Sequence, residues 1–293
     1  MDTSLVERVR SFNRTMTERV GALNDHFLGR NHPLGEARLL WEIGTEGAEV
    51  RELRSRLGLD SGYVSRLLRS LEEQGLIMVG TSENDGRVRH VQLTEAGKVE
   101  RAELDQRADA FARSLLEPLG ESQRVKLVAA MAQVERLLIA SIVQITVADP
   151  TSQDARWCIE QYFTELGERF ETGFDPTLGI SAHAHELVPP AGLLLVARLR
   201  EEPVGCGALK FHENAPGEIK RMWVAPRARG LGLGRRLLLA LEHYAREAGV
   251  AVLHLETNRT LIEAIQLYRD CGYQEVEAFN DEPYAHHWFE KHL

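Results

Sequence analysis

The feature that most restricts the fold of this chain is a glycine-rich loop, R-G-L-G-L-G, at residues 229–234. A strand-like segment, IKRMWVAP, precedes the loop, and a helix-like run rich in leucine follows it. In such a strand–loop–helix unit, bare backbone N–H groups and the positive end of the helix dipole favour a phosphate or pyrophosphate group. Arg229 and Arg235 add positive charge at the same point. The sequence therefore predicts an anion-binding turn within a layered arrangement of strands and helices.

Three kinds of phosphate site use a glycine-rich loop, and their spacing differs. A dinucleotide fingerprint needs G-x-G-x-x-G, whereas Gly230, Gly232 and Gly234 occupy every second position. A Walker loop needs a Lys-Ser or Lys-Thr pair, which does not follow here. The remaining candidate is a site for the pyrophosphate of an acyl carrier such as coenzyme A. A glycine turn made only for packing is the structural alternative.

The length of 293 residues predicts two domains, which we place at residues 1–143 and 144–293. The first range carries 20 Lys and Arg against 22 Asp and Glu, and the second carries 15 against 22. A nearly neutral half with clustered arginines can bind nucleic acid, whereas a half with a net charge of −7 is a poor candidate. No Gly/Ser or Pro-rich tether separates the halves, so we expect a stiff connection.

Several classes of protein are disfavoured by the sequence. The start of the chain does not read as a secretory signal, and no run reaches the roughly 20 apolar residues that span a bilayer. The cysteines Cys158, Cys206 and Cys271 have no paired spacing, which predicts neither a disulfide framework nor a zinc site. We therefore expect a cytoplasmic protein without a metal or a membrane partner, whose thiols are buried or incidental.

Residues 48–77 have the pattern of two helices joined by a tight turn. The second helix has an apolar stripe at i, i+3, i+4 and i+7, formed by Val64, Leu67, Leu68 and Leu71. Asp60 or Ser61 can cap its start, and Gly75 can close its end. Its opposite face carries Ser61, Tyr63, Ser65, Arg66 and Arg69. Such hydrogen-bonding side chains suit a recognition helix in the major groove of DNA.

A predicted β-hairpin around an N-D-G turn follows this helix directly. Its tip carries Arg87 and Arg89, where arginine side chains can reach a minor groove. A hairpin with two arginines would, by itself, indicate only a solvent-exposed hairpin. Because this hairpin directly follows a helix-turn-helix, the sequence predicts the wing of a winged helix.

The stretches LGLDSGYVSRLLRSLEEQGLI and ENDGRVRHVQLTEAGK resemble the winged-helix core of the MarR family of transcriptional regulators. The D-x-R element of that family's wing is matched by Asp85 and Arg87. Its long first and last helices, which form a dimer interface, are matched by residues 3–28 and about 94–143. The resemblance implies a homodimer that reads a pseudo-palindromic operator in double-stranded DNA.

The second half alternates short strand-like and helix-like segments. Residues 191–200, 203–212 and 217–226 predict an antiparallel meander. A helix, a buried strand, a second helix and two final strands follow. The expected fold is therefore a winged helix of the α+β type followed by an α+β domain with a mixed sheet.

The loop after MWVAP and the later stretch AIQLYRDCGY resemble the GNAT acyltransferase superfamily over about residues 145–293. The acyl-CoA loop matches Arg229, Gly230, Leu231, Gly232, Leu233 and Gly234, with Arg235 beside them. The L-Y-x-x-x-G-[FY] helix matches Leu267, Tyr268, Gly272 and Tyr273. The resemblance implies acetyl-CoA as the acyl donor and an amine as the acceptor. It also implies that the main chain of Met222, Trp223 and Val224 binds the pantetheine arm and that Tyr268 protonates the leaving thiolate.

One position of the site departs from the family pattern, and the identity of the catalytic base stays open. The asparagine that the family often has seven residues before the tyrosine is Leu261 here, and Asn258 is the candidate replacement for acyl-donor binding. Glu218 is the candidate base, with His254 and Glu256 as further candidates. The alternatives to these catalytic roles are structural: Tyr268 would pack in the core, and Glu218 would be an ordinary surface carboxylate.

We therefore predict a transcriptional regulator fused to an acetyl-CoA-dependent N-acetyltransferase that acts on a small amine or a protein lysine. One alternative is a regulator whose second domain senses acyl-CoA or a metabolite without turnover. Another is an enzyme whose winged helix serves only dimerisation. We expect the acceptor pocket to be formed by residues 174–188, in which no substrate signature is readable.

Overall fold

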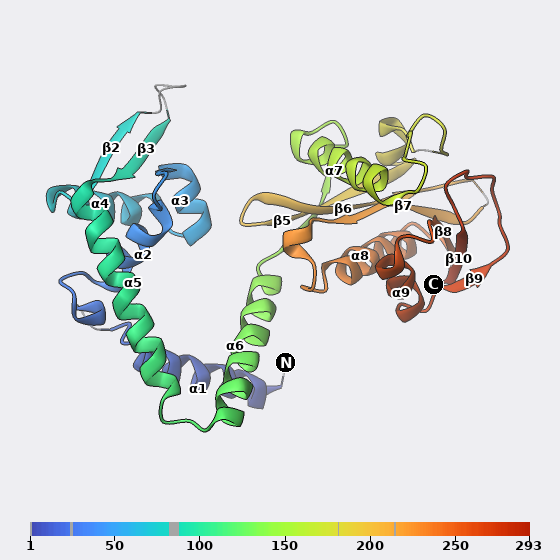
Figure 1. Cartoon of the computed structure of the whole chain (residues 1–293). Coiled ribbons are helices and arrows are strands. Elements are labelled where there is room, and N and C mark those ends of the chain that lie inside the picture. The colour runs from blue at the N-terminus through green and yellow to red at the C-terminus, as the bar shows by residue number, and fades with distance from the viewer. Residues whose placement is uncertain (1, 24–25, 82–87, 181, 214) are drawn as a thin grey trace. The chain divides into compact units, whose positions relative to one another are not determined.

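The computed structural model describes residues 2–23, 26–81, 88–180, 182–213 and 215–293. The chain divides into two compact units, residues 1–129 and 130–293, shown in Figure 1. Helix α6, Glu121–Ser141, crosses this division. Within the described ranges, no helix combines the length and the hydrophobicity that a membrane crossing requires.

The first unit contains a small sheet and several helices. Its helices are α1 (Thr3–Arg19), α2 (Leu34–Ile43), α3 (Val50–Leu57), α4 (Ser61–Glu73), α5 (Glu95–Leu116) and the 3₁₀ turn Phe27–Gly29. Its strands are β1 (Ala48–Glu49), β2 (Ile77–Thr81) and β3 (Arg89–Leu93), antiparallel in the order β1-β3-β2. Helices α3 and α4 followed by the β2–β3 hairpin form the expected winged helix.

Helix α4 confirms the predicted apolar stripe and the predicted caps. The four stripe residues are all buried, namely Val64, Leu67, Leu68 and Leu71. Of the two candidate caps, Asp60 is the one used: its carboxylate accepts a hydrogen bond of 2.9 Å from the backbone N–H of Tyr63. Gly75 has a φ of 70°, the left-handed conformation that closes a helix end.

The long helices differ from the expected ranges. The helix expected at residues 3–28 ends at Arg19, because Gly21 takes a φ of 65° that an α-helix does not continue through. The range 94–143 holds two helices instead of one, α5 and α6. Pro118 lies between them and has no N–H to extend the ladder of α5.

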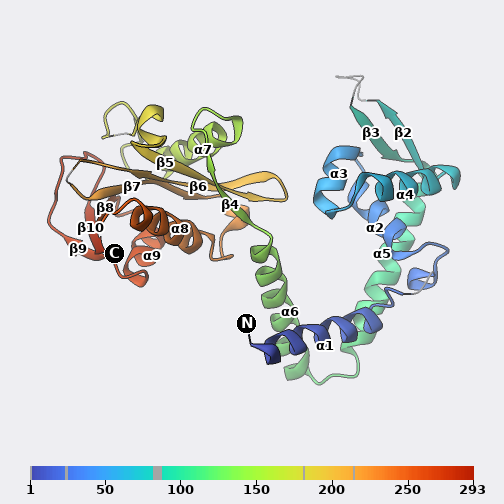
Figure 2. The same ribbon diagram turned by 180° about the vertical axis from the view of Figure 1, so that it is seen from behind.

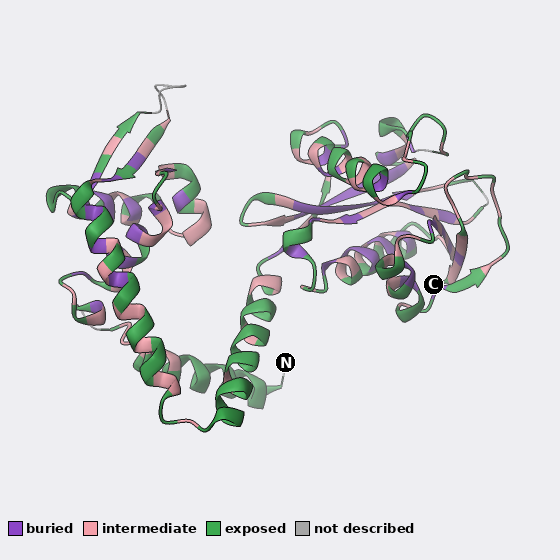
Figure 3. Ribbon diagram, viewed as in Figure 1, coloured by how far each residue is buried: buried purple, intermediate pink, exposed green. Residues whose placement is uncertain are grey.

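Helices α1 and α6 bury none of their residues, and Figure 3 shows them largely in the colour of exposed residues. Their large exposed apolar side chains include Leu5, Val9 and Phe12 on α1 and Val125, Val128, Leu137 and Leu138 on α6. A helix in this state has an apolar surface that the described residues of the chain leave uncovered.

The second unit is built on a seven-stranded mixed sheet in the order β4-β5-β6-β7-β8-β10-β9. The strands are β4 (Gln144–Ala148), β5 (Gly192–Leu199), β6 (Glu202–Lys210), β7 (Gly217–Val224), β8 (Val252–Thr257), β9 (Gln274–Val276) and β10 (His287–His292). Helix α7 (Gln153–Arg169) covers one face, and α8 (Leu233–Glu247) and α9 (Ile262–Asp270) lie on the other (Figures 1 and 2). Short 3₁₀ turns occupy Ala184–Leu187 and Pro226–Ala228. The predicted α+β domain with a mixed sheet is confirmed.

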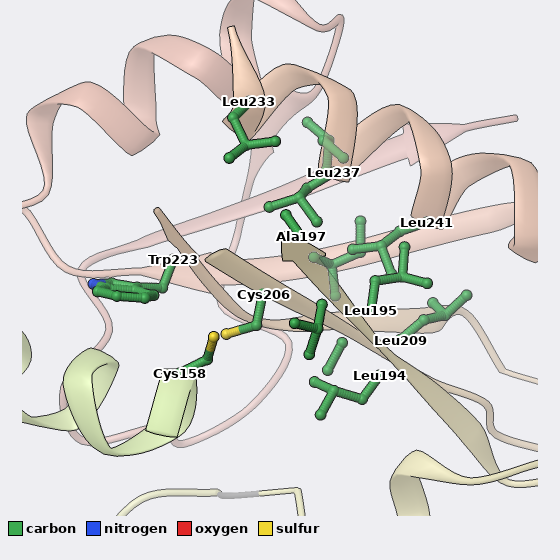
Figure 4. Close-up of a cluster of buried hydrophobic side chains, with 14 of the residues drawn as sticks. Cys158, Leu194, Leu195, Ala197, Cys206, Leu209, Trp223, Leu233, Leu237 and Leu241 are labelled. Atoms are coloured by element: carbon green, nitrogen blue, oxygen red, sulfur yellow. The ribbon is translucent and has the colours of Figure 1, made fainter. Parts of the chain in front are cut away.

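Buried apolar residues of the central strands form the core of this unit. Leu195 and Leu209 of the sheet lie opposite Leu237 and Leu241 of α8 in Figure 4. On the other face, the sulfur atoms of Cys158 and Cys206 point toward each other (Figure 4). Both thiols are free and buried, as expected for cysteines that serve packing.

Strands β7 and β8 pair only at their starts, with Gly217 opposite Leu253 and Glu218 opposite His254. A register shift between β6 and β7 accompanies a left-handed Arg221, which has a φ of 55°. Such a bulge bends a strand. The segment Met222–Val224 therefore has β6 on one side and no described residue of β8 paired with it on the other.

Candidate active site and DNA-binding groove

The glycine-rich loop takes the conformation that its sequence demands. Gly230 and Gly232 have φ angles of 77° and 70°, which favour glycine, and Gly232 immediately precedes α8. A Cβ atom at Gly232 would meet no atom within 4 Å, whereas one at Gly234 would lie 3.2 Å from Leu267 Cδ2. Gly232 therefore leaves open space at the N-terminus of α8, and Gly234 allows α8 to approach α9 closely.

A cavity of about 440 Å³, which we call the loop cavity, lies beside this loop. It is lined by the predicted donor-binding residues Met222, Trp223, Val224, Arg229, Gly230, Gly232, Leu233, Gly234 and Arg235. Leu231 is not part of this lining and packs against the hydrophobic core. Strand, turn and helix N-terminus thus meet at one open space, as the motif predicts. Contact of these residues with an acyl donor stays a prediction.

The arginines around the loop cavity are held by carboxylates. Arg229 donates one hydrogen bond to the carbonyl oxygen of Val224, at 3.0 Å, and forms an ion pair with Glu165 of α7. Glu165 also accepts a bond of 2.8 Å from Trp223 Nε1. Glu165 was not predicted from the sequence, because α7 lies more than 60 positions from the loop. It fixes the direction of Arg229 beside the cavity.

Tyr268 lies at the junction of two cavities, since it lines both the loop cavity and a second, smaller one of about 110 Å³. Only 5% of Tyr268 is exposed. Burial raises the pKa of its phenol, and the Glu256 carboxylate raises it further. Tyr162 of α7 lines both cavities as well, and burial raises its pKa. Both phenols therefore hold their protons at neutral pH, and Tyr162 is a second candidate that the sequence did not reveal.

We call the smaller cavity the aromatic cavity because Phe163, Phe170, Phe174 and Tyr284 line it. Glu256 of β8 also lines it, and its side chain is only 9% exposed. Glu256 Oε1 forms an ion pair with Lys220, while burial raises the pKa of the carboxyl group. Part of the predicted acceptor range contributes to the lining, including Phe174 and Ala182.

The other predicted residues lie farther from the junction. Glu218 lines neither cavity and faces His212 and Lys220, at 3.3 and 3.7 Å. Asn258 lines the aromatic cavity, and its amide is engaged, donating to the carbonyl of Tyr284 and accepting from the N–H of Thr260. The roles assigned to Glu218 as a base and to Asn258 in donor binding stay predictions. Leu261, at the position of the family's asparagine, lines both cavities.

His254 is engaged outside both cavities. Its Nε2 lies 2.8 Å from Glu290 Oε2, and its ring stacks on Phe279 with centroids 4.2 Å apart. The lining of neither cavity includes it. Glu256 is therefore the only one of the three candidate bases to face a cavity within the part of the chain that the structure describes.

In the first unit, a groove lies between α3, the start of α4 and strand β3 of the wing. It is lined by the predicted residues Ser61, Ser65 and Arg89, together with Arg51 and Arg54 of α3. Arg66 and Arg69 are exposed on α4. Tyr63 packs partly against the core, and a Cβ at Gly35 would lie 2.8 Å from its hydroxyl. Asp85 and Arg87 lie outside the described residues.

Comparison with known proteins matches each unit to a family. The model of the acetyltransferase (GNAT) family matches residues 156–273, and that of the MarR family matches residues 30–88. An IAA acetyltransferase of Azospirillum brasilense is 36% identical, over 49% of this chain and 90% of that protein. An uncharacterised N-acetyltransferase of Schizosaccharomyces pombe is also 36% identical, over 44% of this chain and 80% of that protein.

Among solved structures, a GNAT-family acetyltransferase of Staphylococcus aureus covers 52% of this chain and 99% of its own, with 18% identity and a TM-score of 0.43. The sequence matches, not this structural likeness, carry the family assignment. The chain belongs to the acetyltransferase (GNAT) family, and its residues 30–88 match the model of the MarR family.

Proposed function

We propose that this protein is a DNA-binding regulator whose second unit transfers an acetyl group from acetyl-CoA to an amine. The observation that carries this proposal is the position of Tyr268 at the junction of the two cavities. One cavity has the lining of an anion-binding loop, and the other has a buried carboxylate. A donor and an acceptor that enter from different sides would meet at this phenol.

Acetyl-CoA would occupy the loop cavity. The N–H groups of the glycine loop and the N-terminus of the 15-residue helix α8 supply the positive potential for its pyrophosphate. Arg229 and Arg235 add charge at the same rim. The segment Met222–Val224, which β8 leaves unpaired, supplies main-chain groups for the amides of the pantetheine arm.

The transfer requires two proton losses from nitrogen and one proton gain at sulfur. The acceptor ammonium first loses a proton to a carboxylate, and the neutral amine then attacks the thioester carbonyl carbon. The tetrahedral intermediate loses a second proton from nitrogen and expels the thiolate, which takes a proton from the Tyr268 phenol. The carbon–nitrogen bond replaces the carbon–sulfur bond. After Tyr268 regains its proton, the products are an amide, free coenzyme A and one released proton.

Glu256 is the carboxylate that we assign to the first proton transfer. It lines the cavity that Tyr268 also lines, and burial raises the pKa of its carboxyl group, which makes it a stronger base than an exposed glutamate. Glu218 faces the same Lys220 from outside the cavity, at 3.7 Å. We assign Glu218 to holding Lys220, which in turn holds one oxygen of Glu256.

The first unit would bind double-stranded DNA through α4 and the wing. Ser61 and Ser65 face the same groove as Arg51, Arg54 and Arg89, so this edge carries hydrogen-bond donors beside positive charge. The exposed apolar side chains of α1 and α6 would form the interface of a homodimer. Such a dimer places two recognition helices on the two halves of a pseudo-palindromic operator.

Two experiments test these activities separately. Thiol release from acetyl-CoA in the presence of an amine panel tests for an enzyme, and selection of bound duplexes from a random DNA pool tests for a regulator. We expect amine-dependent thiol release and one enriched pseudo-palindromic site. Binding of acetyl-CoA without release for any amine would instead favour a sensor. Amine-dependent thiol release without an enriched DNA sequence would mean that the winged helix serves only dimerisation.

A further inference from the structure

We propose, on the basis of the function proposed above, that the acceptor is a small primary amine carrying an aromatic ring. The aromatic cavity combines a wall of rings with a buried carboxylate oxygen that has no hydrogen-bond partner among the described residues. The rings fit the apolar part of such a molecule, and the carboxylate fits its ammonium group.

The wall is a continuous set of four rings from separate parts of the second unit. Phe163 lies on α7, Phe170 and Phe174 follow that helix, and Tyr284 precedes β10. Phe174 is central to the set: its ring centroid lies 5.4 Å from Phe163, 5.8 Å from Phe170 and 5.0 Å from Tyr284. Rings at such separations pack in tilted or edge-on pairs, and a further ring extends the arrangement favourably.

Three of the rings are only partly buried, whereas large aromatic side chains that serve only to pack a hydrophobic core are usually buried. Phe163, Phe174 and Tyr284 each keep part of their surface open. They line a cavity of about 110 Å³, which is comparable with the roughly 150 Å³ apolar cavity known to bind benzene. The exposed ring surface therefore matches the flat apolar part of a small ligand.

Glu256 supplies the polar end of the site. Its side chain is 9% exposed, Oε1 is paired with Lys220, and Oε2 is buried without a hydrogen-bond donor in the described structure. An unpaired buried carboxylate oxygen is costly, and an N⁺–H group is the strongest donor that can satisfy it. An ammonium group at Glu256 is also in the position from which it loses a proton before attack.

The other charged groups of the cavity also bear on the charge of the acceptor. The Arg221 guanidinium donates to the carbonyl oxygen of Ala182 and lies over the Phe163 ring, with Cζ 5.1 Å from the ring centroid. It is thus engaged with the protein itself. Glu282 also lines the cavity and adds negative charge. The lining thus carries two cations, Lys220 and Arg221, against two carboxylates, Glu256 and Glu282, and both cations are held by protein groups. The oxygen of Glu256 without a hydrogen-bond donor among the described residues therefore favours an acceptor with an ammonium group.

The test compares acceptors on the full-length protein. We expect kcat/KM for 2-phenylethylamine to exceed that for n-butylamine by at least about tenfold, since a ring adds several methylene equivalents of apolar contact. A lysine-containing peptide should resemble n-butylamine. Calorimetry of 2-phenylethylamine on protein loaded with coenzyme A should show saturable binding, which does not depend on turnover.

Two substitutions in the ring wall locate the preference. Phe174→Leu and Phe163→Leu should each lower kcat/KM for 2-phenylethylamine about tenfold and lower that for n-butylamine by a clearly smaller factor. Neither residue lines the loop cavity, so the affinity for acetyl-CoA should stay the same. Phe211→Leu is the matched control, because Phe211 lines neither cavity. Circular dichroism confirms that each variant is folded.

The outcomes separate this inference from the function on which it rests. Equal kcat/KM for the aromatic amine, the aliphatic amine and the peptide, with intact acetyl-CoA binding, would overturn the aromatic acceptor and leave the acetyltransferase standing. The same holds if the control variant loses as much activity as the wall variants. Failure to bind acetyl-CoA at all would overturn the proposed function first, and the acceptor with it.

Discussion

Replacing Gly232 separates the role of charge from the role of shape in the anion-binding loop. Gly232 has a φ of 70°, so any L-residue there costs about 1–2 kcal/mol, with Asn and Asp among the residues that tolerate this conformation best. The added Cβ meets no atom within 4 Å, so the variants should fold. Gly232→Asn and Gly232→Asp place nearly identical side chains at the N-terminus of α8 and differ in one charge.

The size of the charge effect follows from Coulomb's law. A carboxylate about 6 Å from one phosphate charge, at an effective dielectric constant of about 20, is disfavoured by roughly 3 kcal/mol. Since about 1.4 kcal/mol corresponds to a tenfold change in affinity, Gly232→Asp should bind coenzyme A at least about 100-fold more weakly than Gly232→Asn. The difference should shrink as salt is raised, because screening reduces the interaction.

Calorimetry with coenzyme A on the two variants and the wild type measures this difference directly. Circular dichroism and operator binding serve as controls, since the loop belongs to the second unit. Equal affinities of the Asn and Asp variants would mean that no phosphate charge lies near the start of α8. The assignment of the loop cavity to the acyl donor would then be wrong.

Three further predictions concern the remaining site residues. Tyr268→Phe should lower kcat roughly 10²–10⁴-fold with little change in acetyl-CoA affinity, because a proton given only in the transition state does not affect binding; unchanged kcat would assign Tyr268 to packing. In the wild type, kcat/KM should fall as pH falls through the pKa of Glu256, and because burial raises that pKa the loss should occur at higher pH than for an exposed glutamate. Glu256→Gln should remove this limb of the pH profile, and its persistence would identify another base. Arg89→Ala should weaken operator binding by about 1–3 kcal/mol if Arg89 contacts a base. If Arg89 contacts a phosphate, the slope of log affinity against log salt concentration should instead fall by about one. A salt titration that matches the wild type would contradict both. Arg227→Ala, in the other unit, is the control.

Local patterns in the sequence predicted the parts of the fold whose determinants are neighbours in the chain. The stripe of α4 is buried because its four residues repeat at helical spacing, and the glycines of the loop lie at a strand end before a helix as their spacing indicated. The end of α1 was missed: the helix was expected over residues 3–28, whereas it ends at Arg19 and the backbone takes a φ of 65° at Gly21. A periodic pattern reports which face is apolar more reliably than where a helix stops.

The aromatic cavity could not be predicted in the same way. Its ring wall joins Phe163 to Tyr284, and its ion pair joins Lys220 to Glu256, so both depend on contacts between segments that are far apart in sequence. Tyr162 and Glu165 looked like ordinary helix residues, because nothing local marks a side chain that reaches across a cavity. Tyr268 was found only because its helix resembles a known motif.

The early separation of β7 from β8 creates a strand edge in the interior of a sheet. Unpaired main-chain groups on a strand edge are the usual template for joining another polypeptide, and proteins protect them by covering them or shortening the strand. Of the two outer edge strands, β9 is only three residues long and β4 only five, but the interior edge at Met222–Val224 has a different protection. It opens into a cavity walled by α7 and α9, where Arg169 donates to the carbonyl of Thr260 at 2.7 Å. The interior edge thus faces a cavity between two helices of its own unit, where its main-chain groups can serve ligand binding in place of sheet pairing.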